Sequence, residues 1–143
     1  MVSDAPTSLI CARLRGCDVG ALPESALVSA RVALSIPLVL TYTHAAVAGP
    51  VLASHPLDLQ AFPPVEGDKL ADVAHVGPAS VNIEAKLVGV DDEKMEKGAD
   101  PYGELCVRGP SVGVVAGGEG DDDWMKTGSV AQVYTNGAFK VVY

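Results

Sequence analysis

Aromatic side chains are scarce in this sequence: they make up 5% of its 143 residues, with a single tryptophan. Valine, leucine and alanine must therefore supply most of any hydrophobic core. Hydrophobic residues still account for 48% and charged residues for 20% of the chain, which excludes a disordered composition. This length fits one domain or two small subdomains.

Basic residues are also few. The chain has 10 Lys and Arg against 18 Asp and Glu, which gives a net charge of −8. Binding to nucleic acid needs clustered Lys and Arg that neutralise phosphates, and the sequence contains no such cluster. We therefore expect no nucleic-acid partner, and the simplest interpretation of the acidity is a solvated surface.

Cysteine is rare and lacks a metal-site pattern. Cys11, Cys17 and Cys106 are odd in number and do not have the spacing of zinc ligands. Free thiols indicate a reducing intracellular compartment, and both the cytoplasm and the mitochondrion fit. The three histidines are widely spread, so no metal site is expected. The first residues include Asp4 and lack the basic and apolar regions of a signal peptide.

One long stretch without charged residues raises the question of a membrane span. Residues 32–57 contain no Asp, Glu, Lys or Arg, which is long enough to cross a bilayer. Pro37, Pro50 and Pro56 interrupt this stretch, and polar residues lie at 41–44 in its middle. A buried helix–strand–loop segment accounts for it better than a membrane span does.

The chain divides by composition into three parts. Residues 1–60 predict a partial α/β subdomain, and residues 61–80 are rich in proline and glycine and predict a connector. Residues 81–143 alternate between apolar and polar side chains and predict a small, distorted antiparallel β-barrel. The predicted fold class is therefore α+β.

The first part predicts a strand, a helix and a second strand. The apolar run at 9–12 is expected to form a buried strand. A helix should begin near Pro23, because proline suits a first helical turn, and Pro37 should end it. A short buried strand at 38–40 and a polar loop at 41–44 should follow.

The last part predicts strands separated by polar loops. Alternation predicts half-buried strands at 81–87 and 104–108. The charged stretch 91–97 should be a solvated loop, and the glycine-rich and acidic stretch 113–123 a flexible one. The dipeptide at 136–137, Asn-Gly, predicts a hairpin with a type I′ turn.

Four motifs in this order carry a family resemblance. They are Leu40-Thr41-Tyr42, Gly77-Pro78, the octapeptide Gly-Glu-Leu-Cys-Val-Arg-Gly-Pro at 103–110, and Trp-Met-Lys-Thr-Gly at 124–128. Together they resemble the adenylate-forming (AMP-binding) enzymes, and most of all the long-chain acyl-CoA synthetases. The resemblance covers roughly residues 10–143 and implies part of an adenylation domain, namely the last third or so of the large N-terminal domain.

The resemblance implies a chemistry and a candidate site. Such enzymes join a carboxylate to ATP and then pass the acyl group to a thiol. The matching positions would place Tyr42 near adenine and Thr127 and Ser129 at the nucleotide, as a vestigial nucleotide site. ATP or AMP and magnesium are expected only if that site survives.

This sequence departs from the family pattern at the positions that carry the chemistry. Ala45 and Ala46 stand where the family has a phosphate-binding Thr and a magnesium-binding Glu, and alanine can do neither. Ser129 stands where the family has the Asp that accepts both ribose hydroxyls. The phosphate loop, the hinge and the domain with the catalytic lysine have no counterpart here. We therefore predict no catalytic residue.

The surviving motif residues also have structural interpretations. Trp124 is expected to anchor the core, and Glu104 and Arg108 to pair on one strand face. The leading hypothesis is a non-catalytic relic that acts as a structural or interaction subunit of a larger assembly, with a protein partner. The alternative is a fragment or split subunit of an ATP-dependent fatty acid–CoA ligase, which would be inactive alone.

Overall fold

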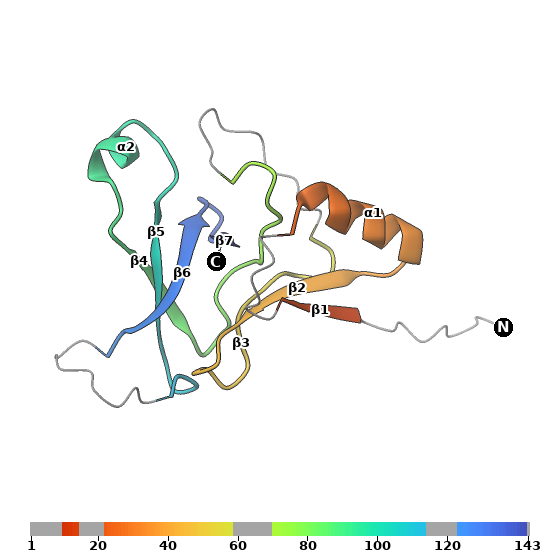
Figure 1. Cartoon of the computed structure of the whole chain (residues 1–143), viewed down its shortest axis with the longest axis horizontal. Coiled ribbons are helices and arrows are strands. Elements are labelled where there is room, and N and C mark those ends of the chain that lie inside the picture. Colours follow the sequence, from red (N-terminus) through yellow and green to blue (C-terminus); the bar gives the residue numbers. More distant parts are fainter. Residues whose placement is uncertain (1–9, 15–21, 59–69, 114–122, 143) are drawn as a thin grey trace.

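The computed structural model describes residues 10–14, 22–58, 70–113 and 123–142, and it shows an α+β protein with two sheets (Figure 1). In chain order the elements are β1 (Ile10–Leu14), α1 (Glu24–Leu34), β2 (Leu38–Thr43), β3 (Pro50–Ala53), β4 (Glu84–Val88), α2 (Asp92–Glu96), β5 (Tyr102–Arg108), β6 (Met125–Val133) and β7 (Phe139–Val142).

The first sheet has the order β1-β2-β3 and is mixed. Strand β1 runs parallel to β2, with α1 in the connection between them, and β3 runs antiparallel to β2. Residues 38–42 of β2 are all buried, so this central strand is covered on both faces. The buried strand predicted at 38–40 is confirmed, and the strand predicted at 9–12 is present from Ile10 onward, while its predicted burial stays a prediction.

Helix α1 begins and ends as its sequence predicts. Pro23 precedes it in an extended conformation, and Glu24 lies in the first turn, where the helix dipole favours a negative charge. Ser35 takes a left-handed conformation with φ of 52°, which ends the helix before Pro37. Leu27, only 1% exposed, packs in the core and holds the helix there.

The polar loop predicted at 41–44 is largely wrong. Thr41, Tyr42 and Thr43 continue β2, because β3 pairs with them and satisfies their backbone groups. Sequence reasoning missed β3, whose short sequence begins with Pro50. Proline at the first residue of a strand is tolerated, but it gives no strand signal.

The second sheet has the order β4-β5-β6-β7, and all its neighbours are antiparallel. Within the described residues β4 and β7 lie at opposite edges, so the sheet is open and the predicted barrel is not confirmed. The predicted strand at 81–87 begins only at Glu84, and Val81 is fully exposed rather than half-buried. The expected solvated loop at 91–97 contains a one-turn helix, α2, with no buried residue.

The hairpin between β6 and β7 exists, but its turn is not type I′. The Gly137 amide donates to the Tyr134 carbonyl, which closes a four-residue turn, and the Tyr134 amide donates to the Ala138 carbonyl. Gly137 has φ of 79°, while Asn136 does not have the positive φ that type I′ requires. This is the three-residue loop with glycine in the left-handed position. Of the predicted loop at 113–123, residues 114–122 lie outside the described residues.

A short segment at 76–80 joins the two sheets. The Val76 amide donates to the Phe139 carbonyl at 2.8 Å, and the Ala53 amide donates to the Pro78 carbonyl at 3.2 Å. Gly77, between them, has φ of 84°, and a Cβ there would lie 2.2 Å from the Ala53 carbonyl oxygen. Only glycine fits this position.

One hydrophobic core includes residues of both sheets. Its largest fully buried members are Leu27, Leu40, Tyr42, Val51, Leu52, Leu105 and Val107. The proposed division at residues 61–80 is not tested by these contacts and stays a prediction. No helix in the described ranges combines the length and the apolar character that a membrane crossing needs.

A buried polar group lies beside this core. His75 is 2% exposed, and its Nε2 lies 3.1 Å from Asp58 Oδ1. The guanidinium of Arg31, a residue of α1, donates to the carbonyls of Asp58 and Leu38. These bonds hold the segment at Asp58 against the helix. Burial lowers the pKa of His75 below its ordinary value of 6.5, although Asp58 partly opposes the shift.

This burial predicts a loss of stability in mild acid. Below pH 6.5 the unfolded chain binds a proton at His75 while the folded chain resists it. The contribution of His75 is therefore complete above about pH 6.5 and falls as the pH drops towards the lowered pKa. We expect the midpoint of urea unfolding to fall more between about pH 7.5 and pH 5 in the wild type than in His75→Gln.

The matched control is His55→Gln, since His55 is exposed. This variant should keep the pH dependence of the wild type. Equal pH dependence in His75→Gln and the wild type would contradict the assignment.

Candidate functional site

The three predicted site residues lie together where the two sheets meet. Tyr42 lies near the end of β2, is 1% exposed, and its hydroxyl lies 2.9 Å from Ser129 Oγ. Ser129 belongs to β6 and is 5% exposed. This contact links residues 87 positions apart in the sequence.

A bulge in β6 places Ser129 and Thr127. In the pairing of β5 with β6, Cys106 faces Lys126 and Glu104 faces Val130, so residues 127–129 stand opposite Leu105 alone. Gly128 takes a left-handed conformation with φ of 72°. Bulges of this kind often re-aim side chains beside functional sites.

The Thr127 hydroxyl holds the bulge closed. It donates to the Leu105 carbonyl at 2.8 Å and accepts from the Ser129 amide at 3.2 Å. Thr127 therefore positions Ser129, while Ser129 contacts Tyr42 directly. The structure brings all three predicted residues into one cluster, although it does not test whether they bind a nucleotide.

The loop after Tyr42 carries the two alanines. His44 Nδ1 accepts from the Ala46 amide at 3.2 Å, and the Ala46 carbonyl accepts from the Gly113 amide at 2.7 Å. Val47 bridges to Val112 and fastens the loop further. The backbone of this loop is fixed, but neither alanine offers a side-chain donor or acceptor.

Metal-binding groups are not gathered at this cluster. Across the described ranges, no three His, Cys, Asp or Glu side chains lie close enough together to hold a metal ion. The cluster itself offers neutral hydroxyls. Such groups can orient a ligand by hydrogen bonds, but they supply neither a general base nor a negative charge for a cation.

Trp124 does not anchor the core as predicted. It is half-buried, and Lys86 Nζ and Arg108 Cζ lie 4.4 and 4.7 Å from the centre of its ring. Both cations lie within the range of cation–π attraction. The predicted core position is wrong because Met125, the next residue, fills the core instead.

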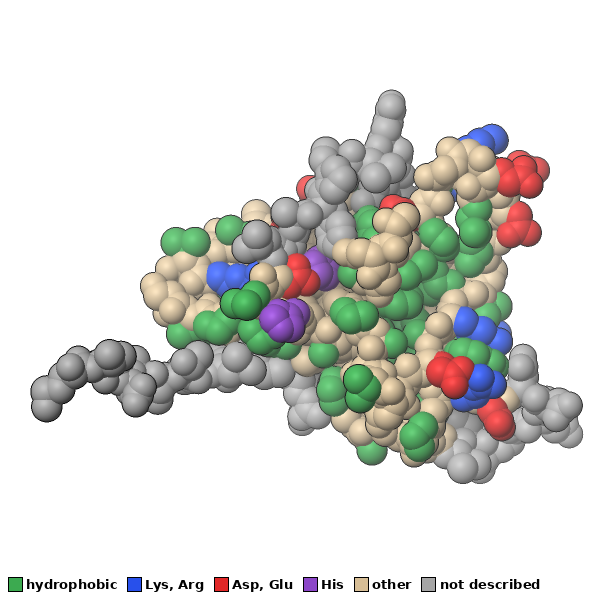
Figure 2. All heavy atoms as spheres, turned by 180° about the vertical axis from the view of Figure 1, so that it is seen from behind, with side chains coloured by type: hydrophobic (Ala, Val, Ile, Leu, Met, Phe, Trp, Pro, Cys, Tyr) green, Lys and Arg blue, Asp and Glu red, His purple; other side chains and the backbone are tan. Residues whose placement is uncertain are grey.

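The expected pair between Glu104 and Arg108 is also wrong. Arg108 pairs with Glu84 at 2.5 Å across the β4–β5 ladder, and Glu104 pairs with Lys126 at 3.4 Å. Cross-strand neighbours, which one strand's sequence does not reveal, decide these pairs. Figure 2 shows positive and negative side chains mixed on the side of the molecule away from α1.

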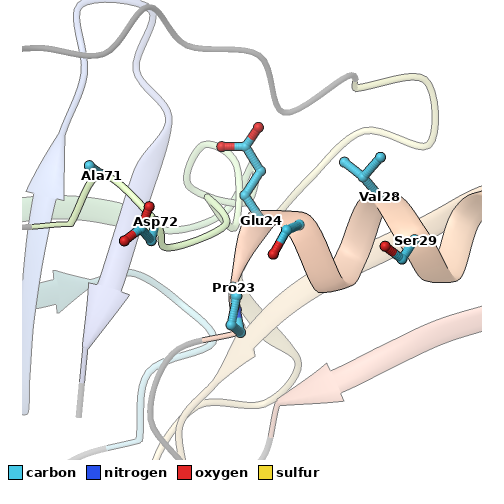
Figure 3. A pocket seen from close by; sticks show the side chains of 7 residues that line it. Pro23, Glu24, Val28, Ser29, Ala71 and Asp72 are labelled. Carbon is cyan, nitrogen blue, oxygen red and sulfur yellow. The ribbon is translucent and has the colours of Figure 1, made fainter.

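An open hollow of about 720 Å³ lies apart from this cluster, at the N-terminal end of α1 (Figure 3). Pro23, Glu24 and Val28 line it from the helix, and Ala71 and Asp72 line it from the facing segment. The Glu24 amide donates to the Asp72 carbonyl at 2.9 Å. Two carboxylates on its lining disfavour an anionic ligand.

Comparison with known proteins identifies the fold. No protein-family model and no curated protein matches the sequence. Among solved structures, O-succinylbenzoate CoA synthetase (MenE) from Bacillus subtilis in complex with AMP is 19% identical with a TM-score of 0.62, over 96% of this chain and 26% of that one. The chain has the fold of one part of an adenylate-forming CoA ligase.

Two further solved structures show the same likeness. The anthranilate CoA ligase AuaEII in complex with anthranoyl-AMP is 16% identical with a TM-score of 0.65, over 93% of this chain and 23% of that one. MatB from Rhodopseudomonas palustris is 16% identical with a TM-score of 0.61, over 93% and 24%. The chain spans about a quarter of the length of these solved proteins.

The likeness confirms the coarse part of the sequence prediction. A partial adenylate-forming domain was expected from four motifs, and the solved structures have that fold over nearly the whole chain. MenE was also solved with ATP and a magnesium ion. The long-chain subtype of the resemblance stays a prediction.

The cluster predicts a measurable coupling between Tyr42 and Ser129. A buried hydrogen bond between neutral groups contributes about 1 kcal/mol net. We expect Tyr42→Phe and Ser129→Ala each to destabilise the fold by about that amount, with a coupling energy of about 0.5–1 kcal/mol in the double mutant. Urea unfolding of the four proteins measures it.

A control pair tests the specificity of that coupling. Ser35→Ala removes an exposed hydroxyl just after α1 and should add to Tyr42→Phe without coupling. Additive behaviour of Tyr42→Phe with Ser129→Ala would show that the hydrogen bond does not join the sheets.

Proposed function

We propose that this chain is a non-catalytic relative of the long-chain acyl-CoA synthetases that acts as a structural or interaction subunit of a larger assembly. The adenylate-forming fold is present, and we propose that its nucleotide site has lost the groups that bind ATP. It rests on one observation, which is the hydrogen bond between Tyr42 and Ser129.

That hydrogen bond occupies the position at which the resemblance expects a ribose-binding carboxylate. A carboxylate there would accept both ribose hydroxyls through strong charge-assisted bonds. Ser129 is neutral, is 5% exposed, and already lies 2.9 Å from the Tyr42 hydroxyl. A nucleotide would have to break this bond and would gain a weaker one.

The loop at 43–46 supports the same proposal. The resemblance expects a hydroxyl for phosphate at Ala45 and a carboxylate for magnesium at Ala46. Neither group is present, so ATP loses two further contacts, and magnesium loses its protein ligand. This chain keeps residues that its fold needs. They include Gly77, where only glycine fits, and Thr127, whose hydroxyl donates a hydrogen bond to the Leu105 carbonyl.

We also propose that the protein resides in a reducing compartment. Cys106 is a buried cysteine in β5 that forms no disulfide within the described residues. Such a residue suits the cytoplasm or the mitochondrial interior.

The alternative function is a fragment or split subunit of an ATP-dependent fatty acid–CoA ligase. The observation in its favour is length, because the chain spans about a quarter of the solved ligases that it resembles. Under this alternative, Tyr42, Thr127 and Ser129 would contact AMP or ATP once another polypeptide supplied the remaining groups. The acyl substrate would be bound mostly outside this chain.

Calorimetric titration of the chain with AMP, and with ATP and magnesium, tests whether this chain alone retains a nucleotide site. We expect no binding by the wild type at nucleotide concentrations up to about 1 mM. In Ala46→Glu combined with Ser129→Asp, the restored carboxylates should produce detectable AMP binding, because they replace the missing ribose and metal ligands.

The control keeps the added charge but moves it away from the site. Thr135→Asp combined with Asn136→Asp adds two carboxylates to the exposed hairpin turn and should leave binding absent. AMP binding by the wild type with a Kd below about 100 µM would overturn the non-catalytic proposal and favour the split ligase.

A further inference from the structure

The two asparagines of this sequence differ in the residue that follows them. Asn82 precedes Ile83, and Asn136 precedes Gly137. A branched side chain hinders attack by the main-chain nitrogen of its own residue, whereas glycine leaves that nitrogen open. Asn136 is exposed in the turn between β6 and β7, and a Cβ added to Gly137 would meet no atom within 4 Å. The open space beside Gly137 gives water access to the Asn136–Gly137 peptide.

The turn holds the Asn136 side chain against this peptide. Asn136 Oδ1 accepts a hydrogen bond from the Ala138 amide at 3.0 Å, so the side chain folds back along the Gly137 backbone. A hydrogen bond to a carboxamide oxygen draws electron density from the attached carbon. It also stabilises the negative oxygen that forms when a nucleophile attacks that carbon. The Ala138 amide therefore assists attack on Asn136 Cγ by the neighbouring main-chain nitrogen.

A second hydrogen bond controls when that attack occurs. The Gly137 amide donates to the Tyr134 carbonyl at 2.9 Å, and the Gly137 nitrogen must leave this partner before it reacts. The other bond of the loop runs from the Tyr134 amide to the Ala138 carbonyl at 2.9 Å and does not involve Gly137. Opening of a single bond in an exposed turn is a local fluctuation, so the reaction needs no global unfolding.

We propose that Asn136 is a site of spontaneous deamidation in the folded chain, and that its isoaspartate product loosens the segment 76–80 that joins the two sheets. The Gly137 nitrogen attacks Asn136 Cγ and forms an N–Cγ bond. The Cγ–Nδ2 bond then breaks, and ammonia leaves with the proton from Gly137. Water opens the resulting cyclic imide: attack at Cγ yields aspartate, and attack at the main-chain carbonyl carbon of residue 136 yields isoaspartate. This modification is independent of the proposed function.

Isoaspartate matters here because it adds a methylene group to the main chain of a short hairpin loop. Strand β7 begins directly after this loop. The Phe139 amide donates to the Gly77 carbonyl at 3.0 Å, and the Phe139 carbonyl accepts from the Val76 amide at 2.8 Å. Lys140, which is 2% exposed, donates from Nζ to the Leu70 carbonyl at 2.8 Å. A longer loop displaces the start of β7 relative to β6, so these bonds weaken together.

Incubation of the purified chain at neutral pH, followed by peptide mapping with mass spectrometry, tests the site. We expect the mass increase of deamidation, with both isoaspartate and aspartate, in the peptide that contains Asn136. The peptide that contains Asn82 is the internal control and should keep its mass. The rate at Asn136 should be about fivefold lower than in the urea-unfolded chain, because the reaction first breaks one neutral hydrogen bond.

A variant and the identity of the product sharpen this test. Asn136→Ser cannot form the imide and should gain no mass during the same incubation. The proposal is overturned if Asn136 stays intact in the folded chain while the unfolded chain deamidates. It is also overturned if aspartate forms without isoaspartate, because direct hydrolysis of the side chain yields aspartate alone.

Hydrogen exchange measures the effect on the segment that joins the sheets. The Val76 and Phe139 amides should exchange about tenfold faster in the isoaspartate form than in the unmodified chain, because local opening becomes easier. Freshly purified Asn136→Asp is the matched control, since it adds the same negative charge without the methylene group, and it should exchange like the wild type. Equal exchange in all three proteins would show that the modification does not act on this segment.

Discussion

The close approach of Gly77 to Ala53 is the constraint on which the rest of the structure depends. A side chain at residue 77 would overlap the Ala53 carbonyl, so β3 and β7 could not share the segment 76–80. That shared segment is one backbone junction between the two sheets, beside the contacts of residues 46–48 with residues 111–113. Because the junction is made of backbone hydrogen bonds, it tolerates change in the side chains around it.

That junction explains how residues of the proposed vestigial site can change without loss of the fold. Tyr42 and Ser129 come from different sheets, and their hydroxyls meet because the junction fixes the sheets relative to each other. A carboxylate that held a ligand would be costly to bury without it. A serine at the same place forms an internal hydrogen bond, so the proposed loss of the ligand leaves no unsatisfied group there.

The surface has two distinct characters. The second sheet is covered with alternating charges, such as the Glu84–Arg108 pair beside Trp124, and these keep it solvated. Within the described residues, the first sheet ends at the parallel strand β1, and the exposed residues in the middle of α1 are uncharged. The chain matches the fold of only about a quarter of the solved ligases. A part of a larger fold exposes surfaces that the whole fold would cover, which fits the difference between the surfaces of the two sheets.

The sequence by itself determined the α+β class, helix α1 and most strands, since periodicity and prolines are local signals. Its four motifs also indicated the adenylate-forming fold that the solved structures share. Only the tertiary structure decided that β2 extends to Thr43, that Trp124 lies between cations, and that Ser129 meets Tyr42. These depend on partners distant in the chain, and no local pattern encodes which distant residue will face a given side chain.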